Sequence, residues 1–134
     1  MQNLLNDIKK HEGFRSEVYK DTLGIDTIGY GFAIKDLVMD QDIAEKILKR
    51  KVENLIKRIK QKFPWYSDIP EEAQDVVANM CYQLGVGGFS KFKKTIKYIS
   101  EKKWDDASIE MLDSLWARQT PNRAIELSNT IKSL

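Results

Sequence analysis

Two carboxyl side chains near the start of the sequence, Glu12 and Asp21, are of the residue types that carry acid–base chemistry. Glu12 closes a helical pattern, and Asp21 falls where an extended segment meets a turn. Two carboxyls in unequal environments can cleave a glycosidic bond, because one donates a proton while the other, ionised, activates water or attacks carbon. The chain has 20 Asp and Glu residues in 134, so such a pair is expected by chance, and solvated surface charge is the simpler interpretation of spacing alone.

The segments around this pair change from helix to strand. Residues 3–12 place apolar side chains on one stripe, which predicts a helix that ends at Gly13. Residues 14–34 combine β-branched and aromatic residues with three glycines, which predicts two short strands joined by a turn at residues 22–24. These residues form the one β region that the sequence predicts.

The rest of the chain has helical periodicity. Residues 41–62 predict one long helix that ends before Pro64, and its roughly 22 residues would span about 33 Å. A strongly apolar helix is expected to open with Pro70 in its first position and to stop at a flexible turn beginning at Gly85. Further helices are expected at about 89–101, 103–113 and 114–118, and the last one opens with Thr120 as N-cap and Pro121 in its first position.

These elements predict a mostly helical α+β fold in one domain, residues 1–134, with two lobes. The small β lobe is expected at about 14–34, and the linking helix at about 41–62. Residues 1–12 and 70–134 are expected to form the larger, helical lobe.

Composition and charge exclude several classes of protein. One cysteine, Cys81, and one histidine, His11, exclude an internal disulfide and argue against a cysteine or histidine metal cluster or a Ser-His-Asp triad. Cys81 is expected to be a small buried apolar residue. No apolar run approaches 18 residues, and no signal peptide is expected.

Net charge is +2, but residues 41–62 carry eight basic against three acidic residues. This block indicates either a contact with an anionic polymer, such as DNA or a bacterial wall, or a solvated helix face.

Three motifs, in order along the chain, carry a family resemblance. Residues 12–31 contain E-G-x-R-x-x-x-Y-x-D-x-x-G-x-x-T-I-G-x-G, residues 79–85 contain N-M-x-Y-Q-x-G, and residues 116–123 contain W-x-x-Q-T-P-N-R. The sequence resembles the phage-type lysozymes of glycoside hydrolase family 24. The resemblance covers most of the chain and implies the two-lobed lysozyme-like fold.

The resemblance also implies residue roles. Glu12 would be the general acid, Asp21 the carboxylate that positions or activates water, and Thr27 the hydroxyl that orients this water. The family inverts anomeric configuration, which requires carboxyl groups about 6.5–9.5 Å apart.

Other matching positions would bind substrate or support the acid. Arg123 would pair with the catalytic glutamate. Tyr82 and Gln83 would line the saccharide cleft, with Gly31 on the opposite wall, although core packing is an alternative for Tyr82.

Two departures from the family pattern concern the small β lobe. Phe32 stands where relatives commonly carry a histidine, so an ion pair known there cannot form, and Phe32 must pack or be exposed. The segment between Gly31 and the long helix is short, which makes the small lobe minimal. His11 is either a surface residue or one that tunes the Glu12–Arg123 pair.

The expected function is a muramidase that cleaves peptidoglycan between N-acetylmuramic acid and N-acetylglucosamine for host lysis. No metal or organic cofactor is expected, nor a nucleic-acid partner or stable membrane insertion, and the protein is expected to be a monomer. It would accumulate in the host cytoplasm and reach the wall through a separate membrane lesion.

One alternative is a wall-binding or structural module without activity, against which Glu12, Asp21 and Thr27 argue. Another alternative is a nucleic-acid binder that uses residues 46–62. The absence of helix-turn-helix spacing, and of aromatic residues beside the basic run on which bases could stack, argues against it.

Overall fold

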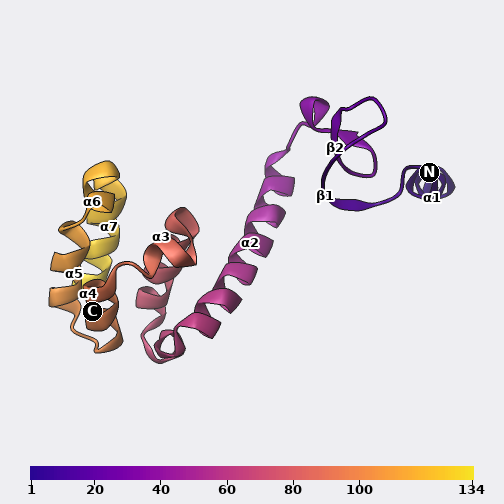
Figure 1. The fold of residues 1–134 in the computed structure, drawn as a ribbon. Helices are drawn as coiled ribbons and strands as arrows, with labels where there is room; N and C mark the ends of the chain where they lie inside the picture. The colour runs from indigo at the N-terminus through magenta and orange to yellow at the C-terminus, as the bar shows by residue number, and fades with distance from the viewer. The chain divides into compact units, whose positions relative to one another are not determined.

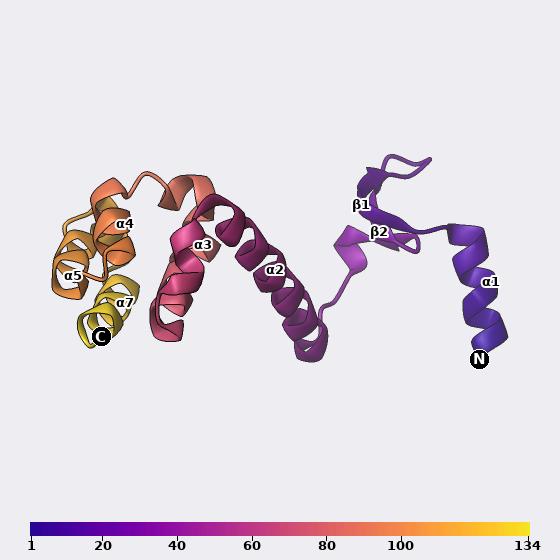
Figure 2. The same ribbon diagram turned by 90° about the horizontal axis from the view of Figure 1, so that it is seen from below.

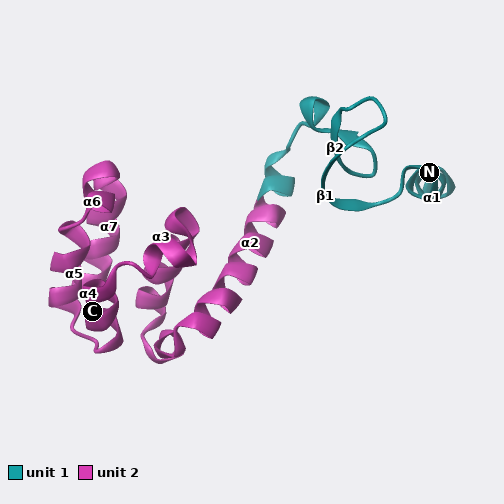
Figure 3. Cartoon of the chain, in the orientation of Figure 1, with its two compact units in different colours: residues 1–44 teal, residues 45–134 magenta.

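The computed structural model describes all 134 residues, and these form two compact units, residues 1–44 and residues 45–134 (Figure 3). Seven α-helices and one three-stranded antiparallel sheet make up the chain (Figure 1). The predicted α+β, mostly helical fold is therefore confirmed. The expected packing of the first helix with the helices after residue 70 concerns the placement of one unit against the other, and it stays a prediction.

The first unit contains a helix and the sheet. It comprises α1 (Gln2–Glu12), β1 (Arg15–Lys20), β2 (Asp26–Gly29), β3 (Phe32–Ala33) and a short 3-10 turn, η1 (Ile34–Asp36). The strands pair in the order β1-β2-β3, and the turn at residues 22–24 joins the first two as predicted. The sequence does not predict the third strand, because two residues are too short to show an alternating pattern.

Aromatic contacts fasten the end of α1 to this sheet. The ring of Tyr30 lies 5.4 Å from that of Phe14 and 6.3 Å from that of Phe32, and Lys9 Nζ lies 5.9 Å from its centre. Phe32 also packs its ring edge against Gly29, although it stays 47% exposed. α1 ends where expected, at a glycine with positive φ, Gly13. The last residue of α1 is thus held beside the sheet.

The second unit is helical. It contains most of α2 (Gln41–Lys62), the 3-10 helix η2 (Pro64–Asp68), and five further helices: α3 (Glu71–Phe89), α4 (Lys93–Ser100), α5 (Trp104–Leu112), α6 (Leu115–Gln119) and α7 (Pro121–Lys132). α4, α5 and α7 lie side by side in both ribbon views (Figures 1 and 2).

All buried apolar residues lie in this unit: Leu55, Ile59, Phe63, Tyr66, Ile69, Ala73, Val76, Val77, Met80, Cys81, Phe89, Ile99, Ala107, Met111, Trp116, Ala117, Ala124 and Ile131. The core of the protein is therefore helical, and the sheet lies outside it.

The predicted bounds of α2 are confirmed, and those of its neighbours need corrections. Pro70 is the N-cap of α3 and not its first residue. Gly85 breaks α3 with φ 76° and ψ 157°, but residues 86–89 continue as helix instead of a flexible turn. α4 consequently begins at Lys93, four residues later than expected, because Phe89 belongs to the preceding turn of helix.

Thr120 and Pro121 occupy the predicted positions at the start of α7. The Thr120 hydroxyl nevertheless donates to the Trp116 carbonyl at 2.9 Å and does not cap α7, so it fastens α6 to α7. None of the helices is long and apolar enough to cross a membrane.

Candidate active site

Glu12 is the last residue of α1, and its carboxyl lies against the backbone of Gly31. A Cβ built on Gly31 would lie 2.8 Å from Glu12 Cδ, closer than such atoms approach in proteins. Gly31 also has a φ of +74°, which side chains disfavour. The structure thus brings Gly31 and Glu12 together within the first unit, and the absence of a side chain at residue 31 makes room for the carboxyl.

Asp21 is fixed by the turn that follows β1. Its Oδ1 accepts hydrogen bonds from the N–H groups of Leu23, at 2.8 Å, and Ile25, at 2.9 Å. Its backbone carbonyl accepts from the Gly24 N–H at 3.0 Å. The second carboxyl oxygen, Oδ2, has no hydrogen-bond donor in the chain. One oxygen therefore anchors the side chain, while the other is available as an acceptor or base.

Thr27 in β2 is the one buried residue of the first unit, with 3% of its surface exposed. Its hydroxyl donates to the carbonyl of Ile25 at 2.8 Å. The same carbonyl accepts from the Asp21 backbone N–H at 2.9 Å. Ile25 therefore links Asp21 to Thr27 through its backbone. Because the Thr27 proton is used in this bond, Oγ1 is left as an acceptor.

Arg123 on α7 is held by Asn79 on α3. Arg123 Nε donates to Asn79 Oδ1 at 2.8 Å, and Nη2 donates to the Asn79 carbonyl at 3.1 Å. Nη1 makes no bond within the chain, so one side of the guanidinium remains able to bind a carboxylate. The sequence placed Asn79 in a motif, but its contact with Arg123 joins residues 44 positions apart.

Gln83 is held in a similar way, because Trp116 Nε1 donates to Gln83 Oε1 at 2.9 Å. The amide NH₂ group of Gln83 is left for another acceptor. Tyr82 beside it is 47% exposed, so core packing is excluded for this side chain. Its contact with a saccharide stays a prediction.

The predicted site residues divide between the two units. Glu12, Asp21, Thr27 and Gly31 belong to the first unit, whereas Tyr82, Gln83 and Arg123 belong to the second. In the first unit the structure places Glu12 against Gly31 and links Asp21 to Thr27, and in the second it places Tyr82 and Arg123 along one hollow. The pairing of Glu12 with Arg123 stays a prediction.

Cys81 and His11, the other side chains that could be reactive, have no part in the acid–base chemistry expected of Glu12 and Asp21. Burial raises the pKa of the Cys81 thiol to about 12, against a smaller opposite effect of Arg58, so the thiol stays neutral as a buried apolar group should. His11 is exposed and makes no hydrogen bond or ion pair, which favours the surface interpretation. No three His, Cys, Asp or Glu residues cluster closely enough to hold a metal ion.

A mostly helical α+β fold with a small antiparallel sheet, a glutamate at a helix end and a turn-anchored aspartate fits a lysozyme-type glycoside hydrolase, whose chemistry uses two carboxyl groups. The sequence profile of the phage lysozymes matches residues 9–128. The chain therefore belongs to the phage lysozyme family and is a lysozyme, a hydrolase that degrades bacterial peptidoglycan.

Individual relatives agree with this assignment. The chain is 33% identical to "Probable T4-type lysozyme 2" of Dictyostelium discoideum, over 92% of this chain and 91% of the relative. It is 29% identical to "Probable T4-type lysozyme 1" of the same organism, over 99% and 96%. It is also 28% identical to the "Pre-baseplate central spike protein Gp5" of Enterobacteria phage T4, over 92% of this chain but 26% of that protein. The match thus covers nearly the whole length of two of these relatives and about a quarter of the third.

The contact between Gly31 and Glu12 makes a testable prediction. Gly31→Ala is expected to cost about 1–2 kcal/mol in the free energy of unfolding, because of its positive φ, and also to displace the Glu12 carboxyl. Thermal unfolding measures the loss of stability, and peptidoglycan hydrolysis at a temperature where the variant is fully folded measures the effect of displacing the carboxyl. Wild-type activity in the folded Gly31→Ala variant would contradict the contact's role.

Proposed function

We propose that the enzyme hydrolyses the β-1,4 bond between N-acetylmuramic acid and N-acetylglucosamine with inversion of configuration. The observation that carries this proposal is the hydrogen-bonded unit of Asp21, Ile25 and Thr27, in which the backbone of Ile25 holds both the Asp21 carboxylate and the Thr27 hydroxyl. Glu12 lies in the same unit of the protein, at the end of α1. The three residues therefore supply an acid, a base and an orienting group from one small lobe.

The proposed reaction proceeds in one displacement. Glu12 donates its proton to the glycosidic oxygen as the bond from that oxygen to the anomeric carbon breaks. A water molecule attacks the anomeric carbon from the opposite face and transfers a proton to Asp21 Oδ2. Thr27 Oγ1 accepts a hydrogen bond from this water, because the hydroxyl proton is committed to Ile25. The new carbon–oxygen bond has the inverted configuration.

Arg123 is proposed to pair with Glu12 before substrate binds. Its free Nη1 and its anchorage to Asn79 support this role. Such a pair favours the ionised carboxyl, whereas exclusion of water by substrate favours the protonated one. Arg123 would therefore hold Glu12 in place, and substrate would convert it to the acid.

We further propose that the protein acts as a monomer against the bacterial wall and accumulates in the host cytoplasm. It would reach the wall through a membrane lesion made by another protein. Fractionation of lysing host cells tests this proposal, because the enzyme should remain in the cytoplasmic fraction until the membrane is permeabilised.

Release of reducing ends from purified peptidoglycan tests the proposed bond. Glycosidic cleavage should produce reducing ends in step with the loss of turbidity. Clearing without reducing ends would indicate cleavage of an amide or peptide bond instead. Binding without clearing would indicate the inactive wall-binding module.

A further inference from the structure

A hollow of about 580 Å³ lies between α2 and α3, entirely within the second unit. Lys51, Asn54, Leu55 and Arg58 of α2 form one wall. Cys81, Tyr82 and Gly85 of α3 form the other. Its volume falls within the range of about 300–1,000 Å³ typical of pockets that bind small molecules or parts of larger ligands.

The hollow is cationic and lacks internal partners. Lys51 and Arg58 supply two positive charges, Asn54 and Tyr82 supply further hydrogen-bond donors, and no acidic side chain lines the hollow. None of these four side chains makes a hydrogen bond or ion pair within the chain. The buried side chains of Leu55 and Cys81 form an apolar floor. An anion placed here would gain contacts with two cations at once.

Tyr82 lines both this hollow and a second one, and the second contains Arg123, the residue proposed to pair with Glu12. The second hollow, of about 290 Å³, is lined by Arg123 of α7, by Asp75, Ala78, Asn79 and Tyr82 of α3, and by apolar residues of α2. A ligand that crosses Tyr82 can therefore reach both hollows on the same unit. Asp75 makes this second hollow less favourable for an anion than the first, which has no acidic lining. Gly85 leaves the rim of the cationic hollow open, because a Cβ there would meet no atom within 4 Å.

We propose that the hollow of Lys51, Asn54, Arg58 and Tyr82 binds a free carboxylate of the peptide attached to muramic acid. The proposal rests on the proposed function. The N-acetylated glycan has no charge of its own along its backbone, so the peptide carboxylates are the anions that accompany this substrate at every repeat. Planar guanidinium and carboxylate groups pair well, and Lys51 and Asn54 would contact the remaining oxygen positions.

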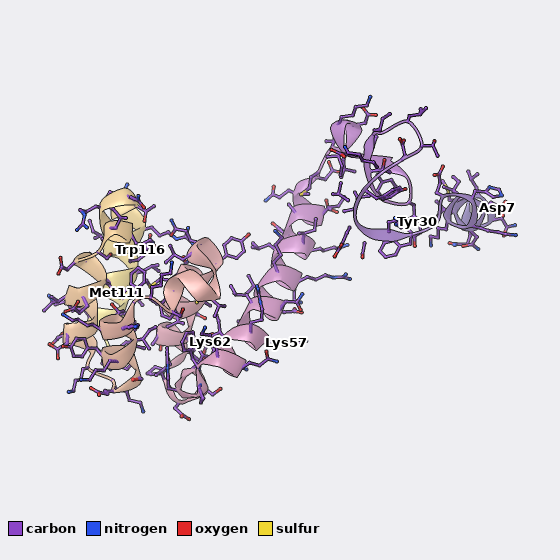
Figure 4. The ribbon with its side chains drawn as sticks, in the orientation of Figure 1. Asp7, Tyr30, Lys57, Lys62, Met111 and Trp116 are labelled. Atoms are coloured by element: carbon purple, nitrogen blue, oxygen red, sulfur yellow. The ribbon has the colours of Figure 1, made fainter.

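The far side of α2 offers a matched control. At roughly 100° per residue, Lys57 and Lys60 lie on the side of the helix opposite Leu55, and neither lines the hollow. Lys57 and Lys62 mark the last turns of α2 in Figure 4. Lys51→Gln with Arg58→Gln, and Lys57→Gln with Lys60→Gln, each remove two positive charges from exposed sites on one helix. Non-specific attraction to an anionic wall should fall equally in both double variants.

The experiment measures kcat and KM by reducing-end release from two soluble glycans. One carries peptides with free carboxylates, and the other is stripped of peptide and has the lactyl carboxyls freed in this way converted to amides, so that it carries no carboxylate. The Lys51/Arg58 double variant is expected to raise KM about tenfold on the peptide-bearing glycan, because charge-assisted bonds are lost. It should leave KM on the stripped glycan unchanged. The Lys57/Lys60 control should also leave KM on the stripped glycan unchanged, and it should raise KM on the peptide-bearing glycan only by the smaller, non-specific effect that both double variants share. Thermal melting confirms that both variants fold.

Other outcomes separate the possible failures. Equal KM values in both double variants on the peptide-bearing glycan would overturn the inference while leaving the lysozyme activity intact. If wild type releases no reducing ends, the proposed function itself fails. A third arm uses glycan whose peptide carboxylates are amidated, with inorganic phosphate as competitor. One further result would contradict binding of a carboxylate and assign the hollow to phosphate. In it, wild type has the same KM on the amidated as on the unmodified peptide-bearing glycan, and phosphate inhibits wild type but not the Lys51/Arg58 double variant.

Discussion

Glu12→Gln is expected to lower the rate of peptidoglycan hydrolysis by about 10²–10⁴-fold, the contribution typical of general acid catalysis. Glutamine has nearly the same shape as glutamate but cannot donate a proton to the leaving oxygen. Glu12 is exposed at the end of α1 and makes no hydrogen bond or ion pair within the chain, so the substitution should leave the fold unchanged. The loss should therefore appear in kcat and not in the melting temperature.

Glu17→Gln is the matched control for this variant. Glu17 lies in the middle of β1, is exposed, and has no partner in the chain. Its substitution removes the same charge from the same unit and should keep wild-type activity. A folded Glu12→Gln enzyme that retains more than a tenth of the wild-type rate would contradict the assignment of the acid.

Asp21→Asn is expected to lower hydrolysis by about 10²-fold or more, since the proposed base loses its charge. The asparagine Oδ1 can still accept from the N–H groups of Leu23 and Ile25, so the turn after β1 should persist. Asp21→Ala removes these bonds as well and should lower both activity and the melting temperature. Comparing the two variants separates the chemical role of Asp21 from its structural role.

Asp26→Asn serves as the control for the aspartate. Asp26 pairs with Lys20 at 2.9 Å across β1 and β2, and both side chains are largely exposed. Such a solvent-exposed pair contributes little to stability, so Asp26→Asn should leave the fold and the activity unchanged. Similar rates for Asp21→Asn and Asp26→Asn would show that Asp21 is a turn residue without a part in the chemistry.

Local signals in the sequence predicted most helix and strand positions. The 41–62 helix has its predicted bounds because an apolar period ends at a proline. The continuation of α3 past Gly85 could not be predicted in this way, because a glycine with positive φ usually ends a helix. Packing explains why the helix continues, because Phe89, the last residue of the added turn, is fully buried.

The sequence predicts residues for a candidate site, but it does not predict the groups that hold those residues in place. Motif positions identified Asp21, Thr27 and Arg123, which the structure places in hydrogen-bonded settings. Ile25 could not be predicted, because it acts through backbone groups that any residue type supplies. The Asn79 contact depends on the packing of α3 against α7, which residue types alone do not determine.

The anomeric configuration of freshly released product tests the proposed mechanism most directly. A single displacement by water, with Asp21 as base, converts a β-1,4 linkage into an α-configured reducing end. Proton NMR recorded during hydrolysis of a soluble peptidoglycan oligomer should therefore show the α-anomer first, with the β-anomer growing only as mutarotation proceeds. Initial appearance of the β-anomer would mean that two displacements occurred, and it would contradict the inverting role assigned to Glu12, Asp21 and Thr27.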